Sequence, residues 1–368
     1  MSLTTTQRKD KARACLLAGA AGDALGYQVE FDDLESIQEM YGPAGIRSYR
    51  LGPKGKALIS DDTQMTLFTA AGLLYGKSQS AKGKDLLDAV RCSYYDWLRT
   101  QQMAFLEEEE VLSELKNRSA VSRLADVQEL YALRAPGNTC LNALATFEAY
   151  DTERRANTRK GCGGIMRVAP AGIFFPPEGE GDYKMSDAEL LRFGADIAAI
   201  THGHPLGYIP AGITALLVRK AIYEGPEKDL GTILDETMAT ARRTFKEEAA
   251  PHQKDEAAAM DYVEELVSMA RMLAMNGHSD TDNILLLGEG WVAEETLAIA
   301  VYCALRYERD LSAALIAAVN HDGDSDSTGA VTGNILGAYL GTAGLGEKWT
   351  KDLELADLIS EMAGELCD

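Results

Sequence analysis

Apolar residues recur along this chain at spacings of three and four, with polar residues between them, which is the pattern of helices that bury one face. Alternating apolar and polar runs rich in β-branched residues are few. The pattern therefore predicts an all-α protein. Helices are expected over residues 11–26, 61–76, 84–100, 106–116, 188–201, 208–224, 229–248, 255–275 and 347–366, and over further segments that reach Ala149 and Tyr307.

Glycine, proline and short polar residues separate the predicted helices. Gly and Pro concentrate in 42–58 and in 172–187, which are therefore expected to be loops. Capping residues are expected at Asn138 or Thr139, at Asp187, and at Asp310 or Ser312. No segment has the composition of a linker and no exact repeat occurs, so the sequence predicts a single compact domain over residues 1–368.

Two predicted helices carry small residues at every fourth position, which places them on one stripe of each helix. The stripes consist of Gly329, Gly333, Gly337 and Gly341, and of Ala14, Ala18, Gly22 and Gly26. Glycine is unfavourable inside a helix by roughly 1 kcal/mol per residue. Four glycines on one stripe therefore predict that another backbone packs very closely against that helix.

Charge and composition narrow the classes of partner. The chain has 368 residues, is 46% hydrophobic and carries a net charge of -21, which disfavours binding to nucleic acid or to an anionic membrane as bulk surfaces. No run of 18 apolar residues occurs, and Met1–Thr6 lacks the apolar core of a signal peptide, so a cytoplasmic protein is expected. The six cysteines are scattered and are expected to be reduced.

Two predicted helices begin with a hydroxyl residue and several carboxylates. Ser60-Asp61-Asp62 precedes one helix, and the run 322–327, with aspartate at 322, 324 and 326 and Ser327 at its end, precedes the glycine-striped helix. A single Ser-Asp-Asp start is usually a helix cap. Three alternating aspartates repel one another, whereas Mg²⁺ or Mn²⁺ would neutralise them. If the two segments meet, they supply enough oxygen ligands for two such cations.

Two further segments are weaker candidates for a ligand site. Gly161-Cys162-Gly163-Gly164, followed by Met166, would allow backbone N–H groups to approach an anion, but it lacks the spacing of a Walker or Rossmann loop. His202 and His204 follow a predicted helix without a third nitrogen or sulfur ligand nearby, so a capping role is the simpler interpretation of the residues alone.

These segments together resemble a known family. Ser60-Asp61-Asp62-Thr63 and Gly323-Asp324-Ser325-Asp326-Ser327 are similar to the two metal motifs of the ADP-ribosylglycohydrolases, which include the dinitrogenase reductase-activating glycohydrolases. Gly22–Gly26 followed by Glu30, the segment 160–170, Thr201-His202 and 288–295 also resemble family segments, in the same order, so the resemblance covers most of the chain. Ser60 and Ser327 stand where many members have threonine, which offers the same oxygen.

The resemblance implies a helical domain with two Mg²⁺ or Mn²⁺ ions in a cleft, and hydrolysis of the bond between C1″ of ADP-ribose and an acceptor, often a protein arginine. The expected metal ligands are Ser60, Asp61, Asp62, Asp324, Asp326 and Ser327. Catalytic roles are expected for Glu30, Asp62 and Asp324. Substrate contacts are expected from Gly161, Cys162, Gly163, Gly164, Met166 and His202.

Two other functions are compatible with the same residues. A carboxylate-rich pair of metals also serves phosphoryl transfer, so a dimetal phosphohydrolase is one alternative. A catalytically silent protein that binds ADP-ribose or has a structural role is the other, because fold does not fix activity. The sequence leaves open the acceptor, which is an arginine, a serine, an acetyl group, a nucleic-acid end or a metabolite. It also leaves open Mg²⁺ against Mn²⁺, the oligomeric state, and whether Glu30 or a metal-bound aspartate moves the proton.

Overall fold

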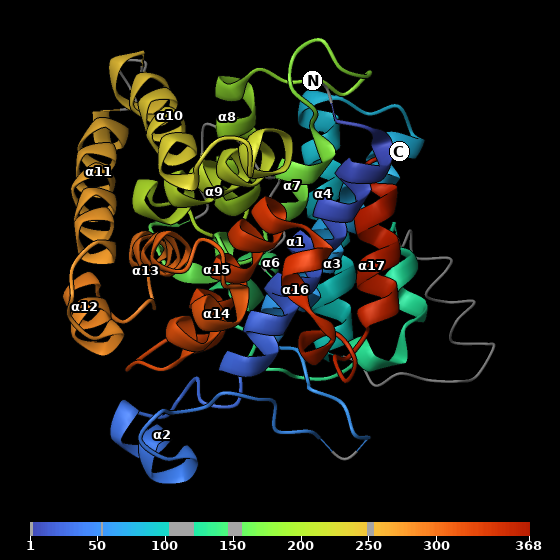
Figure 1. The fold of residues 1–368 in the computed structure, drawn as a ribbon. Coiled ribbons are helices and arrows are strands. Elements are labelled where there is room, and N and C mark those ends of the chain that lie inside the picture. The colour runs from blue at the N-terminus through green and yellow to red at the C-terminus, as the bar shows by residue number, and fades with distance from the viewer. Residues whose placement is uncertain (1–2, 53, 103–120, 146–156, 249–253) are drawn as a thin grey trace.

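Helices form nearly all regular structure in the computed structural model, which describes residues 3–52, 54–102, 121–145, 157–248 and 254–368 (Figure 1). Within these residues there is no β-strand, only two isolated bridges. The first half contains α1 Thr5–Gly26, α2 Leu34–Tyr41, α3 Asp61–Ser78, α4 Gly83–Gln102, η1 Arg123–Asp126, η2 Gln128–Leu130, α6 Asn138–Ala145, η3 Cys162–Gly164 and α7 Ala169–Phe174. The second half contains α8 Asp187–Ala199, α9 Pro205–Glu224, α10 Leu230–Arg242, the π-helix η4 Arg243–Glu247, α11 Lys254–Ala274, α12 Asp280–Leu287, α13 Ala293–Arg306, α14 Leu311–Val319, α15 Ser325–Leu340, α16 Thr342–Leu345, η5 Glu347–Trp349 and α17 Ala356–Glu365.

The close backbone contact that the glycine stripe predicts is present, and its partner is the small-residue stripe of α1. Helices α1 and α15 lie side by side at the centre of the fold (Figure 1). A Cβ added at Gly22 would lie 2.0 Å from the carbonyl oxygen of Gly329, and one added at Gly333 would lie 2.0 Å from that of Ala18. Only hydrogen atoms therefore separate the two backbones along this contact, which fixes where each helix ends relative to the other.

The remaining helices enclose this central pair. Helices α17 and α3 pack on α1, while α13, α14 and α9 pack on α15. Helices α10, α11 and α12 form the outer edge on the left of Figure 1. The apolar side chains of these helices join in one continuous buried core, which confirms the prediction of one compact all-α domain.

Local signals place most helix starts correctly and misplace a few. Ser60 and Asp310 cap α3 and α14. Ser186, not Asp187, caps α8, and neither Asn138 nor Thr139 precedes α6, because both lie inside it. The segment predicted as one helix over 347–366 is divided into η5 and α17. The helix predicted over 106–116, and the extension of α6 to Ala149, lie outside the described residues.

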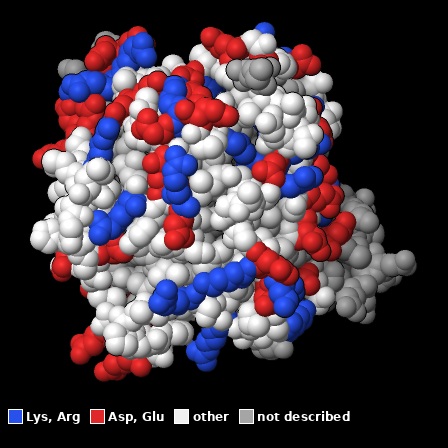
Figure 2. Space-filling view, viewed as in Figure 1, with Lys and Arg blue, Asp and Glu red and all other residues white. Residues whose placement is uncertain are grey.

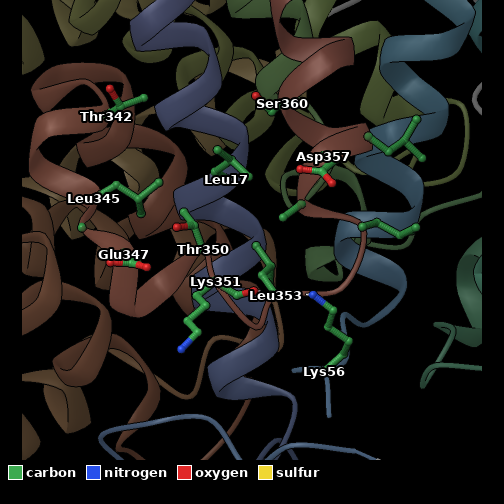
Figure 3. Close-up of a pocket in the computed structure, with 14 residues that line it drawn as sticks. Leu17, Lys56, Thr342, Leu345, Glu347, Thr350, Lys351, Leu353, Asp357 and Ser360 are labelled. Atoms are coloured by element: carbon green, nitrogen blue, oxygen red, sulfur yellow. Dashed lines mark hydrogen bonds between the residues drawn. The ribbon is translucent and has the colours of Figure 1, made fainter. Parts of the chain in front are cut away.

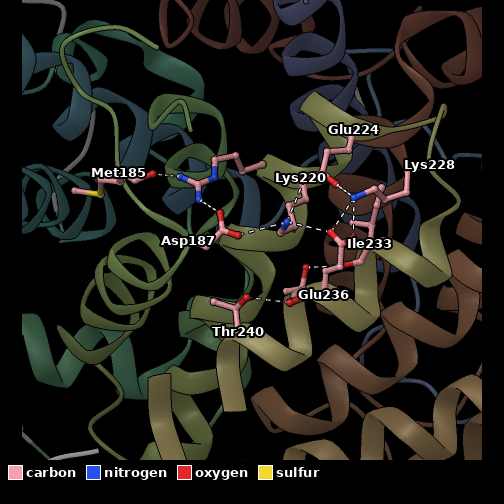
Figure 4. A network of polar contacts seen from close by, with 10 residues as sticks. Met185, Asp187, Lys220, Glu224, Lys228, Ile233, Glu236 and Thr240 are labelled. Atoms are coloured by element: carbon pink, nitrogen blue, oxygen red, sulfur yellow. Dashed lines mark hydrogen bonds and ion pairs between the residues drawn. The ribbon is translucent and has the colours of Figure 1, made fainter. Parts of the chain in front are cut away.

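Charged side chains on the surface tie neighbouring helices together. Lys220 of α9 contacts Asp187 of α8 at 3.4 Å and Glu236 of α10 at 3.3 Å, within the network drawn in Figure 4. Such partly exposed pairs each contribute about 0–1 kcal/mol. Over the face seen in Figure 2, Lys and Arg are scattered among Asp and Glu. None of the described helices combines the length and apolar content that a bilayer span requires.

A candidate metal and ligand site at two acidic helix starts

The first acidic segment forms the N-terminus of α3. Ser60 is the N-cap, and its hydroxyl accepts a hydrogen bond of 3.2 Å from the backbone N–H of Asp62. Asp61 is held by the neighbouring loop, because its N–H donates to the carbonyl of Arg134 at 2.9 Å and its carboxylate accepts from the N–H of Gly137 at 3.2 Å. Asp61 and Asp62 are both buried in the first turn, so they are not solvated capping carboxylates.

The second acidic segment forms the N-terminus of α15. Asp324 is the N-cap and accepts from the N–H of Ser327 at 3.2 Å. Gly323 precedes it with φ +121, a backbone conformation that side chains other than glycine rarely adopt, and this turn sends the chain into the helix. Asp324 and Asp326 are buried. Asp322, on the other side of the turn, is exposed and accepts from the N–H of Leu34 instead.

The structure brings the two segments into direct contact. The Ser327 hydroxyl donates to Asp62 Oδ2 at 2.8 Å, although the two residues are 265 positions apart. The Ser60 hydroxyl also acts on the carboxyl of Asp326, whose pKa burial raises and contact with Asp324 and Ser60 lowers. The predicted ligands Ser60, Asp61, Asp62, Asp324, Asp326 and Ser327 therefore lie in one buried cluster, which we call the acidic cluster.

Asp23 belongs with the acidic cluster, although the sequence did not single it out. It is fully buried on α1 and accepts from the N–H groups of Ser60, at 2.9 Å, and of Thr63, at 3.1 Å, as well as from the Thr63 hydroxyl. Asp23 thus caps the N-terminus of α3 from a different helix. The available signal was a carboxylate within a helix of otherwise small and apolar residues, where it has to be buried.

Glu30 approaches the acidic cluster from the segment that follows α1. Its side chain is buried, and its Oε2 has no hydrogen-bond partner among the described residues. Burial, together with the negative charges of Asp326 and Asp324, raises the pKa of Glu30 to about 10. Next to it, Phe31 is 75% exposed and stacks on Trp291 with ring centres 6.1 Å apart. Glu30 is thus buried, whereas the residue that follows it reaches the surface.

Electrostatic repulsion dominates the acidic cluster. Burial, and then the charge of Asp326, raises the pKa of Asp61, Asp62 and Asp324 well above the usual range for aspartate. The same two causes raise the pKa of Asp23 to about 7. No Lys or Arg in the described residues forms an ion pair with these carboxyls, and the charges that raise the pKa of Asp62 are all aspartates. The protein alone therefore does not neutralise the cluster.

The donor set suits hard divalent cations, which bind carboxylate and hydroxyl oxygens. Two observations support this fit: several buried carboxyls lack a cationic partner, and Glu30 Oε2 lacks any hydrogen bond within the described residues. As the side chains stand, no three His, Cys, Asp or Glu residues in the described part are grouped so that they hold a metal ion. Asp62 and Asp324 instead accept from Ser327 and Cys162, so binding requires these carboxylates to exchange those hydrogen bonds for cations.

The glycine-rich segment lies against the acidic cluster. The Cys162 thiol donates to Asp324 Oδ2 at 2.7 Å, and Met166 Sδ lies 4.0 Å from the Ser327 hydroxyl. The sequence explained these glycines by close approach to an anion, but packing accounts for them in the structure. A Cβ added at Gly163 would lie 2.8 Å from His202 Cε1, and one at Gly164 would lie 2.7 Å from Ala198 Cβ.

His202 packs on the glycine-rich segment, whereas His204 does not. A Cβ added at Gly161 would lie 3.3 Å from His202 Nε2. Burial, and then the charge of Arg167, lowers the pKa of His202 to about 3, so the ring is neutral. His204 Nδ1 accepts from the N–H of Leu206 at 3.0 Å and caps α9. The preference for His202 as the residue nearer the site agrees with this geometry.

A cavity of about 870 Å³ lies elsewhere, between α16 and α17 and over α1 (Figure 3). Its lining includes leucines such as Leu17 and Leu353, with Lys56 and Lys351 near its edge. None of its lining residues belongs to the acidic cluster or to the glycine-rich segment. The cavity is thus separate from the candidate site.

The chain is similar to known proteins over nearly its whole length. A family model described as ADP-ribosylglycohydrolase matches residues 4–368. The chain belongs to the ADP-ribosylglycohydrolase family. It is 26% identical to ADP-ribosylhydrolase ARH3 of Bos taurus over 234 residues, which cover 56% of this chain and 57% of that protein. It is 27% identical to the Homo sapiens ARH3, over 56% of this chain and 58% of that protein. The chain thus matches little more than half the length of these two relatives.

Two other similar proteins align over nearly the whole chain. An uncharacterised protein of Archaeoglobus fulgidus is 24% identical over 97% of this chain and 96% of its own length. A solved structure titled "ADP-ribosylglycohydrolase-related protein complex" is 24% identical, with a TM-score of 0.61 and coverage of 98% of both chains. At this identity the solved structure supports the family's helical fold and no more.

Proposed function

We propose that the protein is a metal-dependent hydrolase that cleaves the C1″ glycosidic bond between ADP-ribose and an acceptor. Membership of the ADP-ribosylglycohydrolase family supports a hydrolase acting on ADP-ribose conjugates. One observation carries the proposal to particular residues, namely the hydrogen bond from Ser327 to Asp62, which unites two distant acidic helix starts. Because the resulting cluster is buried and its negative charges are not neutralised, we assign to it the stabilisation of charge that develops in the transition state.

In this proposal, six side chains hold two Mg²⁺ or Mn²⁺ ions: Ser60, Asp61, Asp62, Asp324, Asp326 and Ser327. Bound cations of this kind orient ribose hydroxyls and lower the pKa of a water molecule. Asp23 maintains the position of α3, because it holds the backbone N–H groups of Ser60 and Thr63. The first turn of α3 therefore keeps its carboxylates in place when hydrogen bonds in the cluster are exchanged for cations.

Glu30 is assigned to proton transfer in this proposal. Its Oε2 is buried without a hydrogen bond in the described residues, so it is free to accept a proton from the attacking water. The high pKa of Glu30 arises from burial and the surrounding aspartates. Neutralisation of those aspartates by cations would remove their repulsion and so lower the pKa of Glu30 toward that of a general base, although the effect of burial would remain.

The glycine-rich segment, Cys162, Met166 and His202 are assigned to the ADP-ribose side of the bond. They lie on the side of the acidic cluster where the Cys162 thiol donates to Asp324. The segment begins with a bridge between Gly161 and Val292, and the Cys162 N–H donates to the carbonyl of Trp291 at 3.2 Å. These contacts fix the position of the glycine-rich segment relative to the N-terminus of α13.

The experiment is a panel of ADP-ribosylated substrates incubated with Mg²⁺, Mn²⁺ or EDTA, with free ADP-ribose measured. The panel contains ADP-ribosyl-arginine, ADP-ribosyl-serine, O-acetyl-ADP-ribose and an ADP-ribosylated nucleic-acid end. We expect ADP-ribose release from at least one substrate, only in the presence of the metal. Release of inorganic phosphate without ADP-ribose would identify a phosphohydrolase, and binding without release would identify a silent member.

Asp322 provides a matched control within the same acidic run. Asp324→Asn should abolish ADP-ribose release, because Asp324 is buried in the acidic cluster. Asp322→Asn should leave release near the wild-type rate, because Asp322 is exposed and contacts Leu34. Equal loss in both variants would contradict the placement of the chemistry at the cluster.

A further inference from the structure

Arg167 is a buried cation that has no carboxylate partner among the described residues. Its side chain is fully buried, and its guanidinium lies over the ring of Tyr94, 4.3 Å from the ring centre. Its Nη1 lies 3.4 Å from the sulfur atoms of Met65 and Cys140, and its Nη2 donates to the carbonyl of Ile197 at 3.3 Å. Burial of a charge without an opposite charge is costly, so a structural role alone is a poor explanation for an arginine at this position.

The strongest contact of Arg167 leads to His202. Arg167 Nη2 donates to the Thr201 hydroxyl at 2.7 Å, and that hydroxyl lies 2.8 Å from His202 Nδ1. An arginine only donates, so the Thr201 oxygen accepts from it and retains one proton to give. The sulfur of Cys140 also lies near this hydroxyl, but a thiol sulfur is a weak acceptor compared with an imidazole nitrogen. His202 Nδ1 is therefore the better acceptor for this proton.

This chain of hydrogen bonds determines the tautomer of His202. Burial and the nearby Arg167 charge keep the imidazole ring neutral, so the ring carries one proton. Because Nδ1 accepts from Thr201, that proton is on Nε2. His202 Nε2 faces the glycine-rich segment, 3.3 Å from the position of a Cβ on Gly161, and makes no hydrogen bond within the described residues. An N–H donor is thus left directed at the segment.

The backbone on both sides of the histidine is also fixed. The His202 N–H donates to the carbonyl of Ala198 at 3.0 Å, and the carbonyl of Thr201 accepts from Asn157 Nδ2 at 2.8 Å. The side chain of Asn157 accepts in addition from the N–H of Gly203. With its backbone fixed, His202 can still rotate its imidazole ring. The hydrogen bond between the ring and the Thr201 hydroxyl restricts this rotation.

We propose that Arg167 is a positioning residue that acts through Thr201 to hold His202 as its Nε2–H tautomer, so that His202 presents a fixed neutral donor to an anionic oxygen bound at the glycine-rich segment. The identity of that oxygen as part of ADP-ribose rests on the proposed function. The tautomer itself does not. A neutral donor in this place binds an anion without adding a second positive charge beside Arg167.

The test measures the tautomer and the affinity separately. The chain has five histidines, and ¹⁵N-labelled histidine gives distinct two-bond proton–nitrogen patterns for the two neutral tautomers. His202→Gln identifies the signal of His202. In the wild-type protein we expect the Nε2–H pattern, unchanged across neutral pH. In Thr201→Val, which keeps the shape but lacks the hydroxyl, we expect a shift toward the Nδ1–H pattern, whereas Thr201→Ser should retain the wild-type pattern.

Affinity for free ADP-ribose, measured by calorimetry with Mg²⁺ present, provides the second measurement. We expect Thr201→Val to bind about tenfold more weakly, as the loss of one well-placed hydrogen bond implies. Thr201→Ser should bind within about twofold of wild type, because its hydroxyl is retained. Arg167→Lys keeps a charge but not the geometry and should behave like Thr201→Val.

An Nδ1–H pattern in the wild type would overturn the proposal, and this measurement requires no variant other than His202→Gln, which assigns the signal. Unchanged tautomer and affinity in Thr201→Val would also overturn it. A wild-type protein that shows the Nε2–H pattern but does not bind ADP-ribose would refute the proposed function while supporting the arrangement of Arg167, Thr201 and His202. The two proposals therefore fail in distinguishable ways.

Discussion

Ser327 donates a hydrogen bond of 2.8 Å to Asp62, and this contact joins the N-termini of two helices that are 265 residues apart. Both residues are buried, and each lies in the first turn of its helix. The relationship places two acidic motifs at one site, and it makes their functional interdependence measurable.

We expect Asp62→Asn and Asp326→Asn to be strongly non-additive. Each change alone should remove most activity, and the double variant should be little worse than the poorer single variant, because the carboxylates hold shared cations and act as a unit. The measurement is kcat/KM for wild type, both single variants and the double variant at saturating metal. Losses that add in free energy would refute the shared site.

Metal removal should abolish activity and change how stability depends on pH. In the folded protein the pKa of Asp23 is raised to about 7, and that of Glu30 to about 10. A carboxyl whose pKa is higher in the folded than in the unfolded protein stabilises the fold at pH values below its unfolded-state pKa. That stabilisation is lost as the pH rises through the folded-state pKa. The Tm of EDTA-treated protein should therefore fall between about pH 5.5 and about pH 8.5. Added Mg²⁺ or Mn²⁺ should restore activity and raise the Tm at the higher pH.

Glu30→Gln supplies the control for this pH dependence, since glutamine resembles the protonated acid and does not titrate. Its Tm in EDTA should fall less than that of wild type over the same range. A wild-type Tm that rises with pH in EDTA, or full activity in chelated protein, would contradict the unneutralised cluster.

Cys162→Ser should retain most activity. The thiol donates to Asp324, and burial together with the nearby aspartates raises its pKa well above the usual value, so it is not a thiolate nucleophile. Serine preserves the donor. A loss of more than about a hundredfold with intact substrate binding, roughly 2.7 kcal/mol, would indicate covalent catalysis instead. Trapping of a covalent ADP-ribose adduct by mass spectrometry would distinguish that outcome.

Gly333→Ala should destabilise the protein by about 3 kcal/mol, because the added Cβ meets the carbonyl oxygen of Ala18 at 2.0 Å and neither backbone has room to move. Gly277→Ala is the matched control: it has no neighbour within 4 Å and should change stability by less than about 0.5 kcal/mol. Denaturant unfolding of both variants with and without metal measures this. Equal stability of the two variants would show that the helix contact is looser than described.

The sequence predicted those parts of the site that depend on local chemistry. Ser60 caps its helix because a serine before a helical pattern does so in most contexts. The glycine stripes predicted a close backbone contact but not its partner, which the facing stripe on α1 supplies. Periodicity likewise predicted an all-α domain, because each amphipathic helix has to bury its apolar face.

Features that depend on tertiary arrangement were missed or misassigned. Asp23 bonds Ser60 across 37 positions, and nothing local marks it as a cap for another helix. The turn at Gly323, which separates the exposed Asp322 from the buried Asp324 and Asp326, is likewise a feature that the spacing of the aspartates does not reveal. Composition also does not reveal which neighbours lie against the glycines at 161–164, and the structure places His202 and Ala198 there.

The contact between α1 and α15 also sets the time in biosynthesis at which the site forms. Synthesis at roughly 5–20 residues per second separates the appearance of Gly22 from that of its partner Gly329 by about 15–60 seconds. Throughout that interval Asp23, Glu30 and the start of α3 exist without the other half of the cluster. If the cluster holds cations as proposed, their binding therefore has to follow translation of α15, which supplies Asp324 and Asp326.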